Sequence, residues 1–368
     1  MKMNYNTHTL ANGLRIIHLP SAQPVVYCGY AVGAGTRDEE LGREEGMAHF
    51  CEHITFKGTE RRSSMQILGH LESVGGDLNA FTNKEETVYH AAVLKENIDR
   101  AVDLLTDIVF HSTYPQAEID KEVEVIVDEI ESYNDSPAEL VYDLFENAVF
   151  GGHPLGHNIL GTAEKLRRYT TADALRFTRR YYRPENSVFF AYGDVDFQKL
   201  VRLLERANAA DAAAESVAAV SLPPQQSAIS DNSCCGGGKD TAAALLPPYV
   251  AQHIEHHMDT HLAHVMLGTR AYDVHDERRI ALYLLNNILG GPGMTARLNV
   301  SLRERNALVY TVESMAQSYS DTGLWAVYFG CDPKNVKRCL RLIRRELDKV
   351  MQRPLSDAQL RAAKRQMR

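Results

Sequence analysis

Apolar residues recur along most of the chain at the spacing of strands or of helices. Alternating or continuous apolar runs predict two short strands around an Asn-Gly turn over residues 9–19, strands over 25–33 and 187–193, and a hairpin over 77–94. Apolar residues three or four apart predict helices over 47–56, 64–74, 95–109, 115–133, 139–149, 169–182 and 197–207. The second half repeats this pattern, with strands over 253–268, 309–314 and 323–330 and helices over 276–289, 296–306, 333–351 and from about 356. The chain therefore resolves into two halves of similar α/β build.

Residues 209–248 interrupt the pattern. The segment is rich in Ala, Ser, Pro and Gly and shows neither the strand nor the helix spacing of apolar residues. We therefore predict a linker between a first domain, residues 1–208, and a second domain, residues 249–368. Cys234 and Cys235 stand side by side within it. Because no other Cys or His lies close by in the sequence, we interpret this pair as incidental rather than as a redox or metal site.

Composition narrows the class of protein. The 368 residues are 44% hydrophobic and 24% charged, which is typical of a soluble globular protein. The net charge of −8 disfavours nucleic acid as the main partner. Six Cys form no C-x-x-C pair. No apolar run of about 18 residues predicts a membrane span, and no signal peptide is visible at the N-terminus. We therefore expect a cytoplasmic protein that does not bind membranes.

Candidate chemistry is concentrated in His49-Phe50-Cys51-Glu52-His53, an H-x-x-E-H sequence within the helix predicted over 47–56. His49 and His53 are four residues apart and share one helical face, where two imidazoles can hold one metal ion. Zinc accepts two His and one carboxylate and leaves a fourth position for water. Glu52, on the same side, would take that water's proton. This order of residues is the inverzincin signature. The alternative is a surface helix with two unrelated His.

A third metal ligand must come from another element, and the pattern alone does not identify it. The helix predicted over 115–133 is rich in acids: Glu118, Asp120, Glu122, Glu124, Asp128, Glu129 and Glu131. Most carboxylates on helices are solvated and bind nothing. Glu122 and Glu129 are seven residues apart, so they share a face of this helix.

The predicted hairpin offers a different kind of site. Residues 79–81 form either an edge strand beside the metal or an ordinary internal strand, and the pattern does not choose between them. An exposed edge strand can bind an extended peptide through main-chain hydrogen bonds.

Together these residues resemble the pitrilysin-type zinc metallopeptidases, a family that includes mitochondrial processing peptidase, insulin-degrading enzyme and short bacterial proteins similar to the processing peptidase. Residues 9–14, 46–59, 79–82, 152–156 and 302–310 carry the resemblance, which covers nearly the whole chain outside the linker. It implies an α+β fold of two similar halves joined by a linker. Each half would be a mainly antiparallel sheet covered by helices.

The resemblance also implies a metal site with one zinc per chain. The family's third ligand is a Glu 76 residues after the second His, which is Glu129 here, beside His49 and His53. Glu52 takes the role of general base. Glu122 matches a carboxylate that supports catalysis without binding the metal.

Substrate contacts follow from the same resemblance. Asn79, Ala80 and Phe81 correspond to the edge strand that holds the substrate backbone. Arg303 and Tyr310 resemble an Arg/Tyr pair that binds substrate and stabilises the oxyanion. Without the resemblance, we would interpret these two residues as a helix-end Arg and a core Tyr.

The expected function is that of a zinc endopeptidase acting on unfolded peptides or processing presequences. The alternative is a non-catalytic peptide-binding or structural subunit of the same fold. Such relatives typically lose motif residues, whereas His49, Glu52, His53 and Glu129 are all present. A purely structural zinc site would need a fourth protein ligand, and no residue stands at a suitable spacing.

One departure from the family concerns the second half. It holds 120 residues against roughly 200 in the first, whereas family members carry a further helical segment and a closing strand, so we expect it to be truncated. In short family members two chains form the peptide chamber. We therefore expect a homodimer or a paired subunit, with Arg303 and Tyr310 acting in cis or on the partner's zinc site.

Overall fold

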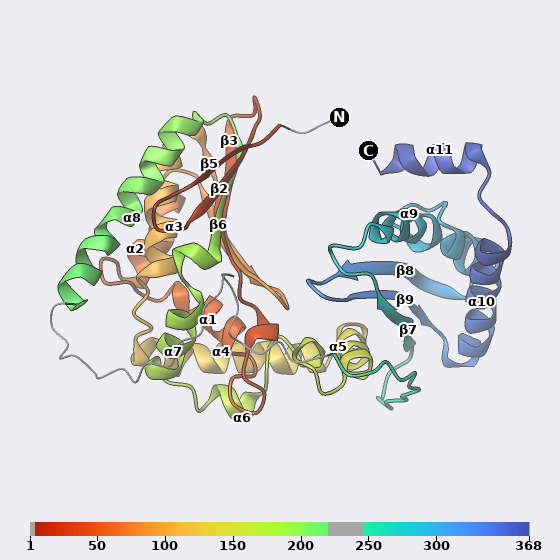
Figure 1. Ribbon diagram of the computed structural model, residues 1–368. Coiled ribbons are helices and arrows are strands. Elements are labelled where there is room, and N and C mark those ends of the chain that lie inside the picture. The colour runs from red at the N-terminus through yellow and green to blue at the C-terminus, as the bar shows by residue number, and fades with distance from the viewer. Residues whose placement is uncertain (1–3, 220–245, 368) are drawn as a thin grey trace, which may run out of the picture. The chain divides into compact units, whose positions relative to one another are not determined.

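The computed structural model describes residues 4–219 and 246–367 (Figure 1). The described residues divide into two units, one comprising residues 4–130 and 158–219 and the other residues 131–157 and 246–367. Each unit has its own sheet and its own buried core. The predicted α+β class with sheets covered by helices is confirmed.

A six-stranded sheet forms the framework of the first unit. Its strands are β1 (Asn6–Thr9), β2 (Arg15–Pro20), β3 (Val25–Val32), β4 (Asp77–Thr82), β5 (Thr87–Leu94) and β6 (Ser187–Gly193), in the spatial order β1-β2-β6-β3-β5-β4. Neighbouring strands are antiparallel except β2 and β6, which run parallel. The hairpin predicted over 77–94 is confirmed, and its first strand, β4, lies at the edge of the sheet.

The helices of the first unit are α1 (Met47–Thr55), α2 (Ser64–Glu72), α3 (Ile98–Phe110), α4 (Gln116–Asn134), α6 (Ala163–Leu166), α7 (Thr171–Tyr181) and α8 (Phe197–Ala219). Figure 1 shows α2, α3 and α8 along one face of the sheet. Tyr30 of β3 lies between Phe110 of α3 and Phe189 of β6, with ring centroids 5.2 and 5.0 Å away. These aromatic contacts join helix to sheet within one core.

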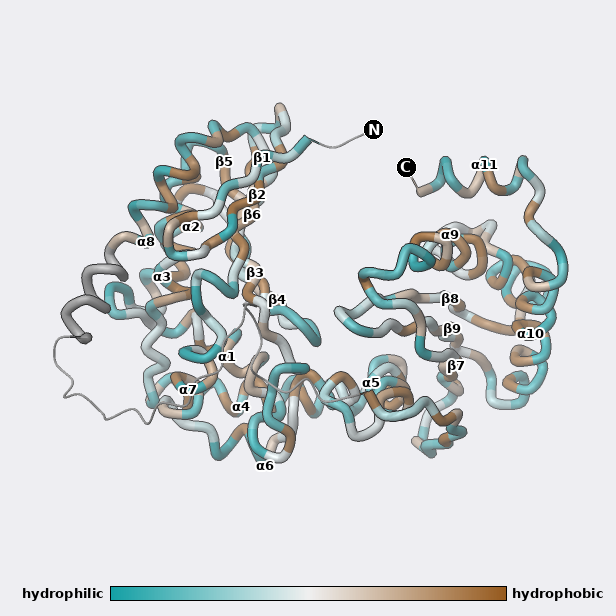
Figure 2. Tube along the Cα trace, in the orientation of Figure 1, coloured by the Kyte–Doolittle hydropathy of each residue, from teal (hydrophilic) through white to brown (hydrophobic). Residues whose placement is uncertain are grey.

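The second unit contains α5 (Pro137–Phe150), β7 (Ala263–Ala271), α9 (Arg278–Gly290), a π-helix (Asn299–Glu304), β8 (Val309–Ser318), β9 (Gly323–Cys331), α10 (Val336–Gln352) and α11 (Asp357–Gln366). Its antiparallel sheet has the order β7-β9-β8. Hydrophobic and hydrophilic positions alternate along α10 in Figure 2, and its buried side includes Cys339 and Ile343. Short 3-10 turns occur at Thr36–Asp38, Lys95–Asn97, Pro154–Gly156, Pro184–Asn186 and Pro333–Asn335. None of the helices in the described ranges has the length and apolar character needed to cross a bilayer.

The predicted domain boundaries differ from these units at residues 131–157. We predicted that this segment lies within a domain of residues 1–208, but it groups with the second unit. The reason is side-chain packing: the Tyr142 hydroxyl of α5 donates to Glu313 Oε1 at 2.6 Å, and its ring lies 5.4 Å from that of Tyr328. The predicted linker, 209–248, falls largely outside the described residues, as do Cys234 and Cys235.

Three predicted elements differ in extent or type. The helix predicted over 197–207 continues to Ala219, because the Ala-rich stretch that we assigned to the linker is itself a strong helix former. The strand predicted over 253–268 begins only at Ala263, after a run of exposed, mainly polar residues. The helix predicted over 296–306 contains the π-helix Asn299–Glu304, a type that the apolar period does not distinguish from an α-helix.

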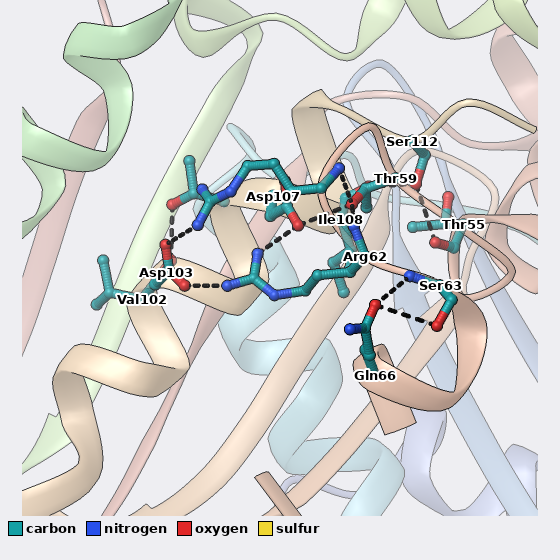
Figure 3. A network of polar contacts seen from close by, with 12 residues as sticks. Thr55, Thr59, Arg62, Ser63, Gln66, Val102, Asp103, Asp107, Ile108 and Ser112 are labelled. Atoms are coloured by element: carbon teal, nitrogen blue, oxygen red, sulfur yellow. Dashed lines mark hydrogen bonds and ion pairs between the residues drawn. The ribbon is translucent and has the colours of Figure 1, made fainter. Parts of the chain in front are cut away.

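A polar network ties the loop after α1 to helix α3 (Figure 3). Arg62 pairs with Asp103 and Asp107, and Asp107 also accepts a hydrogen bond from the Thr59 hydroxyl at 2.9 Å. The Asp107 side chain is 0% exposed, and that of Arg62 is 11% exposed. Because a buried carboxylate is costly without its cation, this network fixes the loop on α3.

Replacing Arg62 by Ala is expected to lower the free energy of unfolding of the first unit by about 3 kcal/mol, because Asp107 would remain buried without its cation. Urea denaturation followed by far-UV circular dichroism measures this change. The control is Lys95→Ala, which removes the exposed Lys95–Asp194 pair and should leave the urea midpoint unchanged. An Arg62→Ala midpoint equal to that of the unsubstituted chain would contradict the role given to the network.

Candidate metal centre

Helix α1 carries the H-x-x-E-H sequence, and its N-terminus is held by two features. Gly46 precedes the helix with a φ of 85°, and a Cβ there would lie 2.7 Å from the Leu160 carbonyl oxygen, so only glycine fits. The carboxylate of Glu39 accepts hydrogen bonds from the N–H groups of Gly46 and Ala48, at 2.9 and 2.8 Å. Two amides that lack partners within the helix are thereby satisfied, and the start of α1 is fixed.

His49, His53 and Glu129 converge on one point. The Nε2 atoms of His49 and His53 lie 3.9 and 3.5 Å from Glu129 Oε2, and the three possible ligand atoms are all within 4.8 Å of one another. The two imidazole rings have centroids 4.6 Å apart. No other group of three or more His, Cys, Asp or Glu in the described ranges is placed to hold a metal ion. The alternative of two unrelated surface His does not fit, because both rings face one carboxylate.

The cluster fits zinc. A tetrahedral zinc ion with ligands at about 2.0–2.2 Å requires ligand atoms roughly 3.3–3.6 Å apart, and the distances to the Glu129 oxygen are 3.9 and 3.5 Å. Two imidazole nitrogens and one carboxylate oxygen are the donors found in catalytic zinc sites. With three candidate ligands among the described residues, a tetrahedral zinc ion would keep a fourth position for another ligand.

Electrostatics within the cluster favour a cation. Burial lowers the pKa of His49, helped by the neighbouring His53, so this imidazole is neutral with a lone pair for a metal. Burial acts in the same direction on His53, but hydrogen bonds to Glu122 and Glu129 outweigh it and raise the pKa of His53. The carboxylates that stabilise a proton on His53 would equally stabilise a divalent cation in its place.

Glu122 lies on α4 seven residues before Glu129 and contacts the cluster without joining it. Its Oε1 lies 3.1 Å from His53 Nδ1, and its Oε2 lies 2.5 Å from Lys57 Nζ. Burial tends to raise the pKa of Glu122, but His53 and Lys57 lower it overall, so the carboxylate stays charged. Lys57 was not among the predicted site residues. The only signal for it was its place four residues after His53, just beyond the predicted helix.

Glu52 lies beside the cluster, and one of its two carboxylate oxygens accepts a hydrogen bond. Its Oε2 accepts a hydrogen bond from the Thr82 hydroxyl of β4 at 2.5 Å, and among the described residues its Oε1 has no hydrogen-bond partner. Burial raises the pKa of Glu52, and the neighbouring Glu129 adds to this, although the bond from Thr82 and the charge of His53 oppose it. A carboxylate of raised pKa is a stronger proton acceptor. Thr82 was part of the matched motif, but we had given it no role.

Strand β4 exposes one hydrogen-bonding edge. Asn83 N–H donates to Glu86 O at 2.8 Å next to the hairpin turn, and hydrogen-bonded pairs alternate in an antiparallel ladder. By that alternation Asn79 and Phe81 bond to β5, whereas the main-chain groups of Ala80 face the open edge. The Ala80 N–H donates a hydrogen bond to Oδ1 of the Asn79 side chain at 2.8 Å.

Arg303 and Tyr310 belong to the second unit. Arg303 lies in the π-helix, and its Nε lies 3.9 Å from Oε1 of Glu304. Tyr310 lies on β8 and is 84% exposed, so it is not the core Tyr that the residue pattern alone suggested. Their roles toward the metal cluster of the first unit remain predictions.

Comparison with known proteins gives matches over both halves of the chain. Residues 16–163 match the family model described as Insulinase (Peptidase family M16), and residues 168–367 match the model described as Peptidase M16 inactive domain. An uncharacterized zinc protease of Streptomyces coelicolor is 36% identical over 354 residues, which cover 96% of this chain and 73% of the relative. The uncharacterized zinc protease YmxG of Bacillus subtilis is 32% identical over 363 residues, covering 98% of this chain and 82% of the relative.

Solved structures with the same fold are more distant in sequence. A protease from Helicobacter pylori aligns with a TM-score of 0.83 at 22% identity, covering 99% of this chain and 84% of that one. A peptidase M16 inactive domain from Pseudomonas fluorescens aligns with a TM-score of 0.80 at 19% identity, covering 99% of this chain and 83% of that one. At these identities the likeness concerns the fold alone.

The metal cluster predicts that the purified protein binds one zinc ion per chain and that His53→Ala lowers its zinc affinity by more than about 100-fold, the upper range for residues that merely support a ligand. Titration of metal-free protein against a chromophoric zinc chelator measures the affinity. His8→Ala, which removes an exposed His on β1, is the control and should bind zinc normally. Unchanged affinity in His53→Ala would show that zinc binds elsewhere.

Proposed function

The chain belongs to peptidase family M16, and on that basis we propose that it is a zinc-dependent endopeptidase that hydrolyses extended, unfolded peptides, including presequences. The observation that carries the proposal is the convergence of His49, His53 and Glu129 beside the carboxylate of Glu52. Thr82 bonds to one oxygen of Glu52, and the other oxygen has no hydrogen-bond partner among the described residues. A structural zinc site would enclose its ion with a fourth protein ligand, and this cluster has three members.

Each side chain of the site has a definable part in hydrolysis. Zinc, when bound by the three ligands, supplies a Lewis acid that polarises the scissile carbonyl and makes water more acidic. Glu52 accepts the proton of the attacking water through its free oxygen and then passes it to the leaving amine. Thr82 holds the other oxygen, so Glu52 presents one fixed proton acceptor.

Peptide binding is assigned to the open edge of β4. An extended chain would pair with the outward main-chain groups of Ala80, replacing the contact with the Asn79 side chain. Phe81 is 43% exposed and offers an apolar contact on the face opposite Thr82. Because β4 also carries the Thr82 that contacts Glu52, substrate bound there lies next to the base. The net charge of −8 favours basic peptides.

The second unit and a second chain complete the proposal. We assign Arg303 and Tyr310 to substrate binding and oxyanion stabilisation, in the same chain or across a homodimer or paired subunit. The rival function is a non-catalytic, peptide-binding or structural subunit. The match to a model described as an inactive domain covers residues 168–367, whereas the metal cluster and Glu52 all lie within residues 16–163.

Glu52→Gln is expected to reduce hydrolysis by about 10²–10⁴-fold while zinc binding stays intact, because the amide cannot accept the water's proton. The assay is cleavage of an unstructured basic peptide of about 20–30 residues, long enough to pair as a strand, followed by mass spectrometry. A chelator-treated sample should lose activity and regain it with zinc. A zinc-loaded chain that cleaves nothing would favour the non-catalytic subunit.

Ala80→Pro is expected to raise KM for the peptide several-fold with a smaller effect on kcat, because it removes an outward N–H without breaking the ladder to β5. Zinc affinity and the urea midpoint should remain those of the unsubstituted chain. The contrasting variant, Phe81→Pro, removes an N–H that bonds to β5 and should lower stability. A normal KM in Ala80→Pro would exclude the edge of β4 as the peptide site.

A further inference from the structure

The carboxylate of Glu122 is held at both oxygens. Oε1 lies 3.1 Å from Nδ1 of His53, and Oε2 lies 2.5 Å from Nζ of Lys57. The Glu122 side chain is only 13% exposed, and that of Lys57 is 25% exposed. Other ion pairs of the same helix are far more open to solvent: in the Arg167–Glu124 pair the side chains are 50% and 59% exposed. The Lys57–Glu122 pair therefore differs from the exposed pairs whose contribution is small.

The two groups that hold Glu122 come from one end of one helix. His53 is in the last turn of α1, and Lys57 follows four residues later, just after the helix ends at Thr55. A carboxylate bound only by His53 would be free to rotate about its side-chain torsions. The second contact, to Lys57, fixes the plane of the carboxylate and therefore the direction from which it meets the imidazole.

The direction of that contact decides what His53 offers to a metal. With Nδ1 donating its hydrogen to Glu122, the lone pair of the neutral ring is on Nε2, the atom that lies 3.5 Å from Glu129. A rotated or displaced Glu122 would leave both the tautomer and the tilt of the ring unspecified. Such outer partners of a metal-binding His commonly change metal affinity when they are removed.

Hydrogen bonds fix the chain around Lys57. Its N–H donates to the Ile54 carbonyl oxygen at 3.0 Å. Before it, the Ser112 hydroxyl donates to the carbonyl oxygen of Thr55 at 2.9 Å. After it, Thr59 bonds to Asp107 within the network that ties this loop to α3 (Figure 3). The segments on both sides of Lys57 are therefore anchored, one to Ser112 just after α3 and the other to Asp107 within α3.

We infer that Lys57 is a positioning residue of the metal centre: it fixes Glu122, which in turn orients His53 toward the metal. The inference rests on the proposed metal centre but not on peptidase activity, so the two can fail separately. Lys57 also lines a surface pocket of about 530 Å³ together with Thr113, Pro115 and Glu118. A shorter or uncharged side chain there remains in contact with solvent, and the fold should tolerate it.

The test is the zinc dissociation constant of the metal-free full chain, measured at one pH by competition with a chromophoric chelator. Glu122→Gln and Lys57→Met should each weaken zinc binding, by about 10–100-fold and by about tenfold respectively. Lys57→Arg should keep the zinc dissociation constant within about threefold of that of the unsubstituted chain, because a guanidinium can also hold the carboxylate. Lys121→Met removes an exposed cation of α4 and should have no effect.

The double variant separates positioning from a general structural effect. If Lys57 acts through Glu122, adding Lys57→Met to Glu122→Gln should change the dissociation constant by less than about twofold, because coupled residues are not additive. Circular dichroism checks that each variant is folded, and Lys57→Gln replaces Lys57→Met if the latter is not. The inference would be overturned by normal zinc binding in the folded Lys57 variant or by losses of zinc affinity that add up independently in the double variant. It would also be overturned if the unsubstituted chain bound no zinc. Zinc binding that follows the expected series without any peptide hydrolysis would overturn the proposed function alone.

Discussion

The site depends on one constraint: two imidazoles on a buried helix must meet a carboxylate from a different helix within about 4 Å. The four-residue spacing of His49 and His53 satisfies the first half of this requirement within α1. The approach of the carboxylate is provided by packing between helices. Apolar residues of α1, such as Phe50 and Ile54, share one core with Ile126 and Ile130 of α4. Glu129 belongs to the same helix and directly precedes Ile130 in sequence, so the core that stabilises the unit also sets the distance between the candidate ligands.

The two ends of α1 are held by different means, and both bear on the site. At the N-terminus, Glu39 accepts two main-chain amides, and Gly46 allows the chain to pass close to Gly161. At the C-terminus, the loop is anchored to α3 through Asp107, and Lys57 contacts Glu122. The sheet contributes from a third direction, since Thr82 of its edge strand contacts Glu52. The loop after α1 thus holds Glu122 through Lys57, and the edge strand β4 holds Glu52 through Thr82.

The sequence predicts the parts of this arrangement that are local. The H-x-x-E-H spacing gives the shared face of His49 and His53, and the hairpin pattern gives β4 and β5. The predicted third ligand is not local: Glu129 is one of seven acids on its helix, and only the family spacing selected it. Lys57 and Thr82 were missed because their partners come from other elements, and contacts between elements leave no periodic signal.

Larger features were missed for related reasons. Residues 131–157 follow the first half in sequence but bury their side chains in the second unit, which depends on tertiary contacts such as that between Tyr142 and Glu313. The Ala-rich continuation of α8 was assigned to the linker because it lacks an apolar period, although Ala itself favours a helix. In this case intrinsic propensity was the better guide.

The central claim is that His49, His53 and Glu129 bind one zinc ion and leave one position open. The most direct test is a crystal structure of the zinc-loaded protein with diffraction data collected on both sides of the zinc absorption edge. We predict a single anomalous peak about 2.0–2.2 Å from the two Nε2 atoms and from a Glu129 oxygen, with no fourth protein ligand. A peak at other residues, or a fourth protein ligand closing the site, would contradict it.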